Sequence, residues 1–149
     1  MLRLLMAIHY TFSVRNKTRG TTLAERGWRA DNMARRVVGL LAHSCMEPGT
    51  GLLIIPCNSI HSIGMRFLFD AVFLSPGPEY KVLHLIREMK PWRASRMVFA
   101  AQSVLELPAG VISATGTELG DFLEILPIEP EPKPSSSEIA AAAKAEDGH

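Results

Sequence analysis

Apolar and polar residues alternate at the start of the chain in the manner of a β-hairpin. Tyr10, Phe12 and Val14 fall on one side of an extended segment over residues 10–15. Turn-forming residues occupy positions 16–20, and residues 21–30 can return as a second strand. The pattern therefore predicts a hairpin over residues 10–30.

A helical period follows the hairpin. Asp31 is placed to act as an N-cap, and Pro48-Gly49 breaks the segment at its far end. Between them Arg35 and Arg36 fall outside an apolar stripe at helical spacing, which consists of Met33, Val37, Leu40 and Leu41. This spacing predicts one main helix over about residues 31–44.

Short apolar runs bounded by Gly and Pro predict the remaining strands. The connections are too short for parallel crossovers, except across the single helix, so we expect mostly antiparallel pairing. The predicted class is α+β, with a strongly curved β-sheet or a small barrel-like domain. The strands are expected at 52–55, 67–74, 80–89, 104–107 and 122–126, with a brief helical turn at 110–115.

The composition changes at Pro127. Residues 1–126 have enough apolar material for one domain, whereas residues 127–149 are rich in Pro, Glu and Ala. We expect that tail to be disordered, with a transient helix at most, because its alanine run is shorter than the roughly 12–15 residues an isolated helix needs. No run approaches the roughly 18 apolar residues of a membrane span, so a cytoplasmic location is the default expectation.

Charge is unevenly distributed although the formal net charge is only +1. Residues 1–46 carry eight Lys/Arg against two Asp/Glu, while residues 127–149 carry two against five. Such asymmetry allows weak nucleic-acid association through the basic N-terminal region, and it equally fits a solvated basic face. The residues concerned are Arg15, Lys17, Arg19, Arg26, Arg29, Arg35 and Arg36.

Four motifs occur in order along the chain: residues 56–74 (PCNSIHSIGMRFLFDAVFL), 91–93 (PWR), 103–110 (SVLELPAG) and 116–121 (GTELGD). This ordered set closely resembles domain of unknown function family 192 (DUF 192), over roughly residues 11–126. The resemblance implies a compact, β-rich domain with a helix packed against a strongly curved sheet. It implies no activity, because the family's biochemical role is not established.

The segment 58–70 is the first candidate for chemistry. His61 and Asp70 suit general acid/base work, because an imidazole titrates near neutral pH and a carboxylate can fix its tautomer. Arg66 can bind an anion in bidentate fashion. The structural alternative is that Arg66 and Asp70, which would share one face of a strand, simply neutralise each other.

Trp92 and Arg93 form the second candidate, a stacking and anion-binding platform. If the loop after Pro56 meets the bend at Pro91, both candidates line one polar cleft. That cleft would accept a small anionic or polar ligand, or a peptide. Its predicted ligand-binding residues are Asn58, His61, Arg66, Asp70, Trp92 and Arg93.

Two further alternatives stay open. His43, Cys45, Cys57 and His61 supply ligands that zinc accepts, although their spacing is not that of a zinc finger. A hydrolase-like enzyme would use His61 and Asp70 as acid and base, although no nucleophile with an obvious base is evident. The sequence thus favours a non-catalytic binding module without a cofactor, and it identifies neither the ligand nor the oligomeric state.

Overall fold

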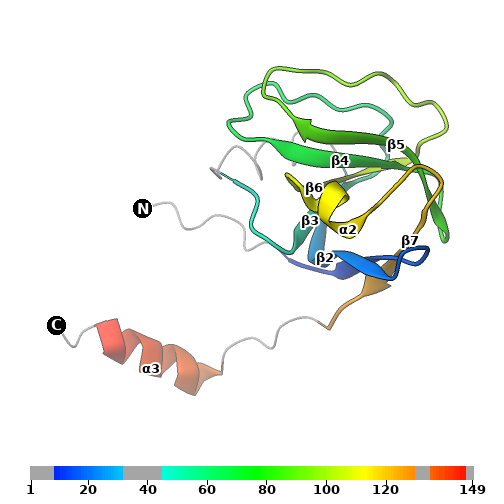
Figure 1. Cartoon of the computed structure of the whole chain (residues 1–149). Coiled ribbons are helices and arrows are strands. Elements are labelled where there is room, and N and C mark those ends of the chain that lie inside the picture. The colour runs from blue at the N-terminus through cyan, green and yellow to red at the C-terminus, as the bar shows by residue number, and fades with distance from the viewer. Residues whose placement is uncertain (1–8, 32–44, 130–134, 147–149) are drawn as a thin grey trace.

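A computed structural model of the chain describes residues 9–31, 45–129 and 135–146. Seven strands form a closed barrel in the order β1-β2-β3-β6-β4-β5-β7 (Figure 1). This confirms the prediction of a small, mostly antiparallel barrel-like domain. The strands are β1 (Phe12–Asn16), β2 (Thr21–Ala30), β3 (Thr50–Ile54), β4 (Phe69–Leu74), β5 (Tyr80–Met89), β6 (Ser103–Pro108) and β7 (Phe122–Pro127).

β1 and β2 form the predicted antiparallel hairpin. Gly27 of β2 pairs with Phe12, and a side chain at position 27 would overlap the Phe12 ring, so this position requires glycine. β2 and β3 are parallel, with Gly27 opposite Gly51. The connection between these parallel strands consists of residues 31–49, where the sequence allowed a crossover. Residues 32–44 of the predicted helix lie outside the described residues.

Two apolar layers fill the domain. The first draws on all seven strands and therefore lies inside the barrel; it includes Val14, Leu53 and Leu105. The second covers the outer face of β3, β6 and β4 and includes Ile54 and Phe73. Full burial of each large side chain contributes about 1.5–3 kcal/mol, so both layers stabilise the fold. Two long connections pack on the second layer through Ile60, Met65 and Ala101.

Asp70 of β4 stabilises a junction inside the barrel. It is fully buried, and its two carboxylate oxygens accept the backbone N–H groups of Glu88 (2.9 Å) and Ile112 (2.8 Å). The short helix α2 (Val111–Thr115) begins after Gly110, whose φ of 95° suits glycine and which offers no side-chain cap. Asp70 of β4 supplies that cap, because its carboxylate accepts the Ile112 N–H.

The C-terminal segment contains helix α3 (Ser136–Glu146), where the sequence predicted a transient helix at most. A capping box explains its start, because Ser135 Oγ accepts the Glu138 N–H and Glu138 accepts the Ser135 N–H at 2.7 Å. Residues 135–145 are all exposed. Disorder of this tail in solution stays a prediction. Within the described residues, no helix has the length and apolar character needed to cross a membrane.

Candidate functional site

Two long connections run side by side over the second apolar layer. Residues 57–67 lead from β3 to β4, and residues 90–101 lead from β5 to β6; we call these segments the loop pair. Their backbones are joined by hydrogen bonds from Ser95 N to Ile60 O and from Val98 N to Asn58 O, both 2.8 Å. The loop pair forms the upper edge of the molecule in Figure 1. The predicted meeting of the loop after Pro56 with the bend at Pro91 is therefore present.

Ser62 joins the two loops. It is fully buried, its hydroxyl donates to Lys90 O at 2.6 Å, and it accepts the Arg93 N–H at 2.9 Å. Its backbone N–H donates to Arg93 O, and its carbonyl accepts the Trp92 N–H. One serine thus holds residues 90–93 in place.

A shallow hollow lies beside this junction. It has a volume of about 410 Å³ and is lined by Asn58, Ser59, His61, Ala94 and Ser95, together with Ile54, Pro56, Cys57 and Ile60. This volume lies within the roughly 300–1,000 Å³ range of small-molecule sites. The His61 Nδ1 atom accepts the Ile63 N–H at 3.3 Å, so a local hydrogen bond orients the imidazole.

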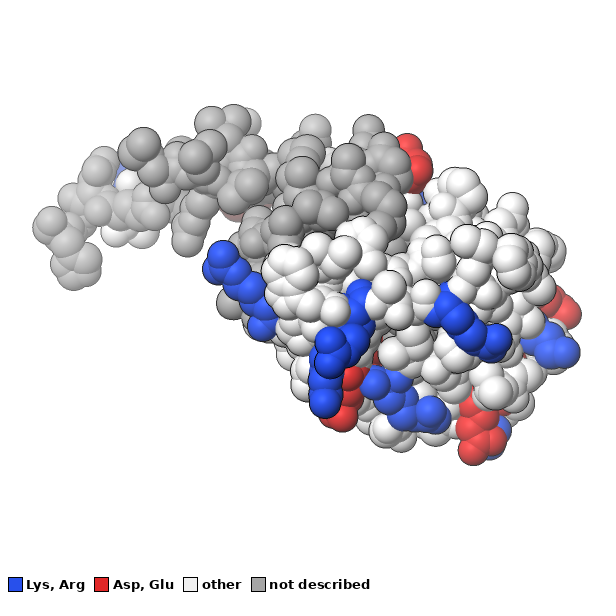
Figure 2. Space-filling view, turned by 90° about the horizontal axis from the view of Figure 1, so that it is seen from above, with Lys and Arg blue, Asp and Glu red and all other residues white. Residues whose placement is uncertain are grey.

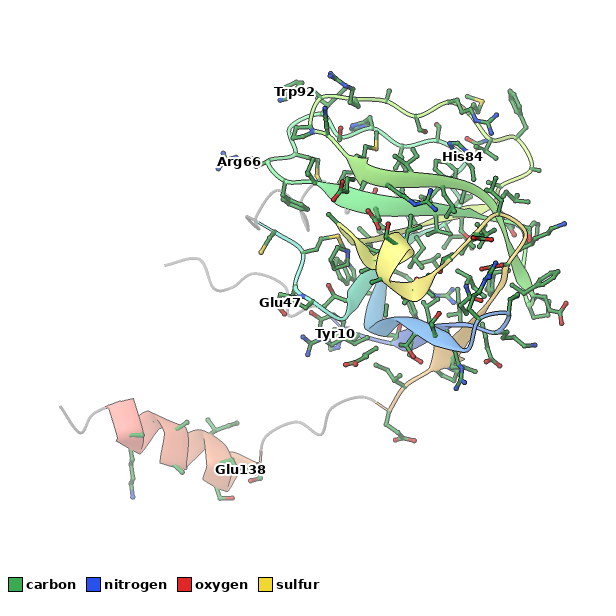
Figure 3. The ribbon with its side chains drawn as sticks, in the orientation of Figure 1. Tyr10, Glu47, Arg66, His84, Trp92 and Glu138 are labelled. Carbon is green, nitrogen blue, oxygen red and sulfur yellow. The ribbon has the colours of Figure 1, made fainter. Side chains whose placement is uncertain are left out.

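Only some of the predicted site residues meet there. Asn58 and His61 line the hollow. Arg66, Trp92 and Arg93 belong to the loop pair but are exposed, and Trp92 exposes 66% of its surface (Figure 3). None of these three lines the hollow.

Asp70 lies elsewhere. Along β4, Phe69, Ala71 and Phe73 face the layer under the loop pair, while Val72 and Leu74 face the barrel interior. Since strand side chains alternate, Asp70 points to the interior, where both oxygens accept backbone N–H groups. Asp70 is therefore a structural residue and does not line the predicted cleft.

This placement also corrects two sequence-based pairings. Arg66 precedes β4 and is exposed, so it shares no strand face with the buried Asp70. His61 and Asp70 lie on opposite sides of β4, so Asp70 cannot orient the His61 imidazole as an acid/base pair requires. The hydrolase-like arrangement built on these two residues is not formed.

The alternative metal site is only partly described. His43 lies outside the described residues, and Cys45 is exposed. The Cys57 thiol donates to Ser59 O at 3.0 Å. Among the described residues, no three His, Cys, Asp or Glu side chains are grouped so that they could hold a metal ion.

A buried polar cluster, which we call the turn network, connects the β1–β2 turn with residues 116–121. Asp121 is almost fully buried and accepts from Asn16 Nδ2 (3.0 Å), Arg19 Nε (3.0 Å) and the Glu118 N–H (3.0 Å). Arg19 also contacts Glu118 at 2.8 Å. The GTELGD motif thus closes a turn, and it provides no phosphate loop.

Opposing effects act on the Asp121 carboxylate. Burial raises its pKa, but hydrogen bonds from Arg19, Asn16 and the Glu118 backbone outweigh burial and hold the pKa below its ordinary value. The same hydrogen bond to Asp121, with its charge, raises the pKa of Arg19. The turn network is therefore ionised throughout the neutral range.

The other described cations of the basic N-terminal region are also largely engaged. Lys17 lies 4.0 Å from Glu79, and Arg26 lies 3.4 Å from Glu47 and over the Tyr10 ring. Arg29 lies over the Phe12 ring. Arg35 and Arg36 lie outside the described residues. Arg15 in β1 is exposed. The charges of Lys17, Arg19 and Arg26 are compensated by carboxylates and therefore offer little to a polyanion.

A second hollow of about 470 Å³ lies beside β5 and is lined by His84, Leu85, Arg87, Glu118 and Leu119. The His84 ring packs edge-on against Phe73, and Arg96 donates to its Nδ1 at 3.4 Å. Burial, followed by the charge of Arg96, lowers the pKa of His84. The imidazole is therefore held neutral more strongly than a solvated histidine.

Sequence reasoning missed the roles of two residues. Ser62 carries the loop junction, and the only sequence signal was its position inside the first motif. Glu106 is fully buried in β6, opposite Leu52 and Ala71. A glutamate between Leu105 and Leu107 in an apolar strand was the available signal for a buried carboxylate.

Solved structures share the fold of this chain. A Sinorhizobium meliloti protein described as a "putative transcription regulator" is 21% identical, with a TM-score of 0.63 over 78% of this chain and 93% of that protein. A Novosphingobium aromaticivorans protein of unknown function is 14% identical, with a TM-score of 0.65 over 83% and 91% of the two chains. At these identities the likeness establishes the fold alone.

Sequence relatives give the family. A UPF0127 protein from Pyrococcus furiosus is 31% identical over 115 residues, which cover 73% of this chain and 94% of the relative. A UPF0127 protein from Thermococcus sibiricus is 29% identical over 117 residues, covering 73% and 71%. The profile of DUF192, described as "Uncharacterized ACR", matches residues 14–125. The chain therefore belongs to the DUF192 family, as the motifs indicated.

Proposed function

We propose that this protein is a non-catalytic binding module and that the hollow beside His61 is its ligand site. The observation that carries the proposal is the convergence of residues 56–61 and 94–95 on one open concavity. Asn58, Ser59 and Ser95 provide donors and acceptors there, and His61 provides a titratable group. A small number of polar groups in a partly apolar hollow is typical of ligand sites.

The ligand class follows from the local charge. The loop pair contains no Asp or Glu, it includes Arg66 and Arg93, and Arg93 directly precedes the lining residue Ala94. A small anionic or polar ligand therefore fits this site better than a cation. Backbone hydrogen bonds across the loop pair hold the site in shape before binding, which lowers the entropic cost of association.

Alternative functions have less support. A hydrolase would need a different partner for His61, because Asp70 is engaged inside the barrel. Nucleic-acid association would need the N-terminal cations, of which Lys17, Arg19 and Arg26 contact carboxylates. Binding that is absent at low salt would exclude the nucleic-acid alternative.

A thermal-shift screen tests the proposal. Inorganic phosphate, small carboxylates and acidic dipeptides are added to the full chain and to Asn58→Ala and His61→Ala variants. A ligand at 100 times its dissociation constant should stabilise the wild type by about 2.7 kcal/mol. Both variants should lose most of that stabilisation, while Lys81→Ala, an exposed control in β5, retains it. A stabilising ligand indifferent to both hollow variants would contradict the proposal.

A further inference from the structure

The loop pair exposes large apolar side chains that the proposed ligand site does not use. Ile63 exposes 53% of its surface, Trp92 66%, Met97 51% and Phe99 83%. None of the four lines either described hollow. Exposed apolar residues concentrated in one part of a surface mark an interaction site.

The scaffold below these residues is fixed. Ile60, Ser62 and Met65 of the first loop are buried against the barrel. The side chains on the other side of the same loops therefore point away from it. Trp92 has a φ of 60°, a left-handed conformation that is costly for a side chain of this size. The fold thus holds an exposed indole at a strained backbone position, as functional sites often do.

The charge of the loop pair has one sign. Its residues include Arg66, Lys90, Arg93 and Arg96 and no Asp or Glu. Among the described residues, no ion pair joins any of these four cations to a carboxylate. Figure 2 looks down on this upper face and shows Lys and Arg side chains spread over largely uncharged surface, with Asp and Glu side chains towards its edges.

We propose that the loop pair docks on a membrane surface containing anionic lipids. Projecting aromatic and aliphatic side chains among Lys and Arg are the combination that binds the interface between headgroups and acyl chains. Each cation near an anionic leaflet contributes about 1 kcal/mol, and Trp is favoured at the interfacial depth. A fluid lipid surface accommodates each projecting side chain, whereas a folded partner would need a matching pocket for each one.

The remainder of the domain is compatible with this orientation. β7 and the start of the acidic C-terminal segment lie on the side of the barrel opposite the loop pair (Figure 1). An anionic membrane surface would therefore contact the cationic loop pair and lie far from the glutamates of β7 and of the start of the C-terminal segment. The docking surface is distinct from the proposed ligand site, since none of the side chains that carry it lines the hollow.

Vesicle co-sedimentation of the full chain tests the inference. One vesicle contains phosphatidylcholine alone, and the other also contains about 30 mol % phosphatidylserine. The wild type should sediment with the anionic vesicle at low salt and remain in solution with the neutral one. Lys90→Glu/Arg93→Glu should weaken vesicle binding more than about tenfold, since two charges change sign.

The apolar contribution has its own variants. Trp92→Gly/Phe99→Ser should weaken vesicle binding about tenfold or more. Leu119→Ser is the matched control, because Leu119 is 64% exposed but lies outside the loop pair. Trp92→Phe should retain binding but abolish the blue shift of tryptophan emission on docking, which leaves Trp28 as the remaining tryptophan.

Three outcomes would overturn the inference. These are a wild type that stays in solution with anionic vesicles at low salt, loop variants that bind as well as the wild type, and a Leu119→Ser variant that loses as much binding as the loop variants do. Unfolding curves confirm that each variant is folded. His61→Ala should leave vesicle binding intact, so failure of the ligand-site proposal is distinguishable from failure of this one.

Discussion

The turn network and the loop pair both contain arginine, but the arginine side chains have different surroundings in the two regions. In the turn network, Arg19 contacts two carboxylates and Asp121 is buried under three donor groups. In the loop pair, Arg66 and Arg93 are exposed and the neighbouring Trp92 projects into solvent. The comparison shows that Arg19 fixes a turn through its two carboxylate partners, whereas the charges of Arg66 and Arg93 remain available at the surface. Substitutions that affect stability should therefore concentrate in the barrel and its turn network.

The largest expected effect is at Asp70. Asp70→Ala removes the acceptor of two backbone N–H groups, the buried one of Ile112 and the part-buried one of Glu88. Since each such bond to a charged group is worth about 1.5–3 kcal/mol, the variant should lose about 3–5 kcal/mol of unfolding free energy. Urea unfolding measures this loss. Arg66→Ala, on the exposed loop, should stay within about 0.5 kcal/mol of the wild type. Equal losses at the two sites would break the distinction between barrel and loop.

Asp121 comes next, and its effect depends on pH. Asp121→Asn should lose about 2 kcal/mol at pH 7, because it removes a buried carboxylate that accepts from Arg19 and Asn16. The folded pKa is depressed below the unfolded value of about 3.9, so the stabilisation is complete above that value. It is lost as pH falls through the folded pKa.

The difference between wild type and Asp121→Asn should therefore shrink as the pH is lowered below about 4. Chemical unfolding at a series of pH values measures it. Glu124→Gln, in β7 but outside the turn network, should show no such dependence. A constant difference across the pH range would mean that the Asp121 charge does not carry the effect.

A smaller effect on stability, in a higher pH range than that of Asp121, is expected at His84. Burial and Arg96 lower its folded pKa below the unfolded value of about 6.5, so the unfolded chain takes up the proton first. Wild-type stability should therefore fall as pH drops below about 6.5. His84→Gln should make that fall less steep below about pH 6.5. Lys81→Gln should leave the slope unchanged, and a slope unaffected by His84→Gln would contradict the assignment.

The smallest change in stability is expected at Trp92. Trp92→Gly removes an exposed side chain from a φ of 60°, which glycine adopts freely. The free energy of unfolding should stay the same or rise by about 1 kcal/mol. Trp28→Ala, where the ring packs against the second apolar layer, should instead be destabilising by about 2 kcal/mol or more. A destabilised Trp92→Gly would show that Trp92 has a structural role.

Periodicity predicted most of the barrel because each strand carries its own signal. Residues 80–89 and 104–107 are bounded by Gly or Pro, and their apolar positions alternate or are continuous. Connection length allowed a parallel crossover only across the predicted helix after β2, and β2 and β3 are the parallel pair. The strands that these local features predict are present in the structure.

The site was predicted less completely, because it depends on where a strand begins. The sequence placed Arg66 and Asp70 on one strand, whereas β4 begins at Phe69 and turns Asp70 inward. Residues 57–67 carry no period that reports which side chains face the barrel, so the role of Ser62 was not visible. The meeting of the two loops was predicted because both motifs fall at strand ends. Backbone hydrogen bonds between residues far apart in the sequence hold the loops together.

The pairing of β1 with β7, which sets Ser13 opposite Leu126, brings the ends of the barrel sequence together. A short linker there, with new chain ends opened at the exposed turn Pro76–Glu79, would give a circular permutant that keeps every strand neighbour. Because the permutant keeps the pairing of β1 with β7 and every other strand pair, it should fold to the same barrel.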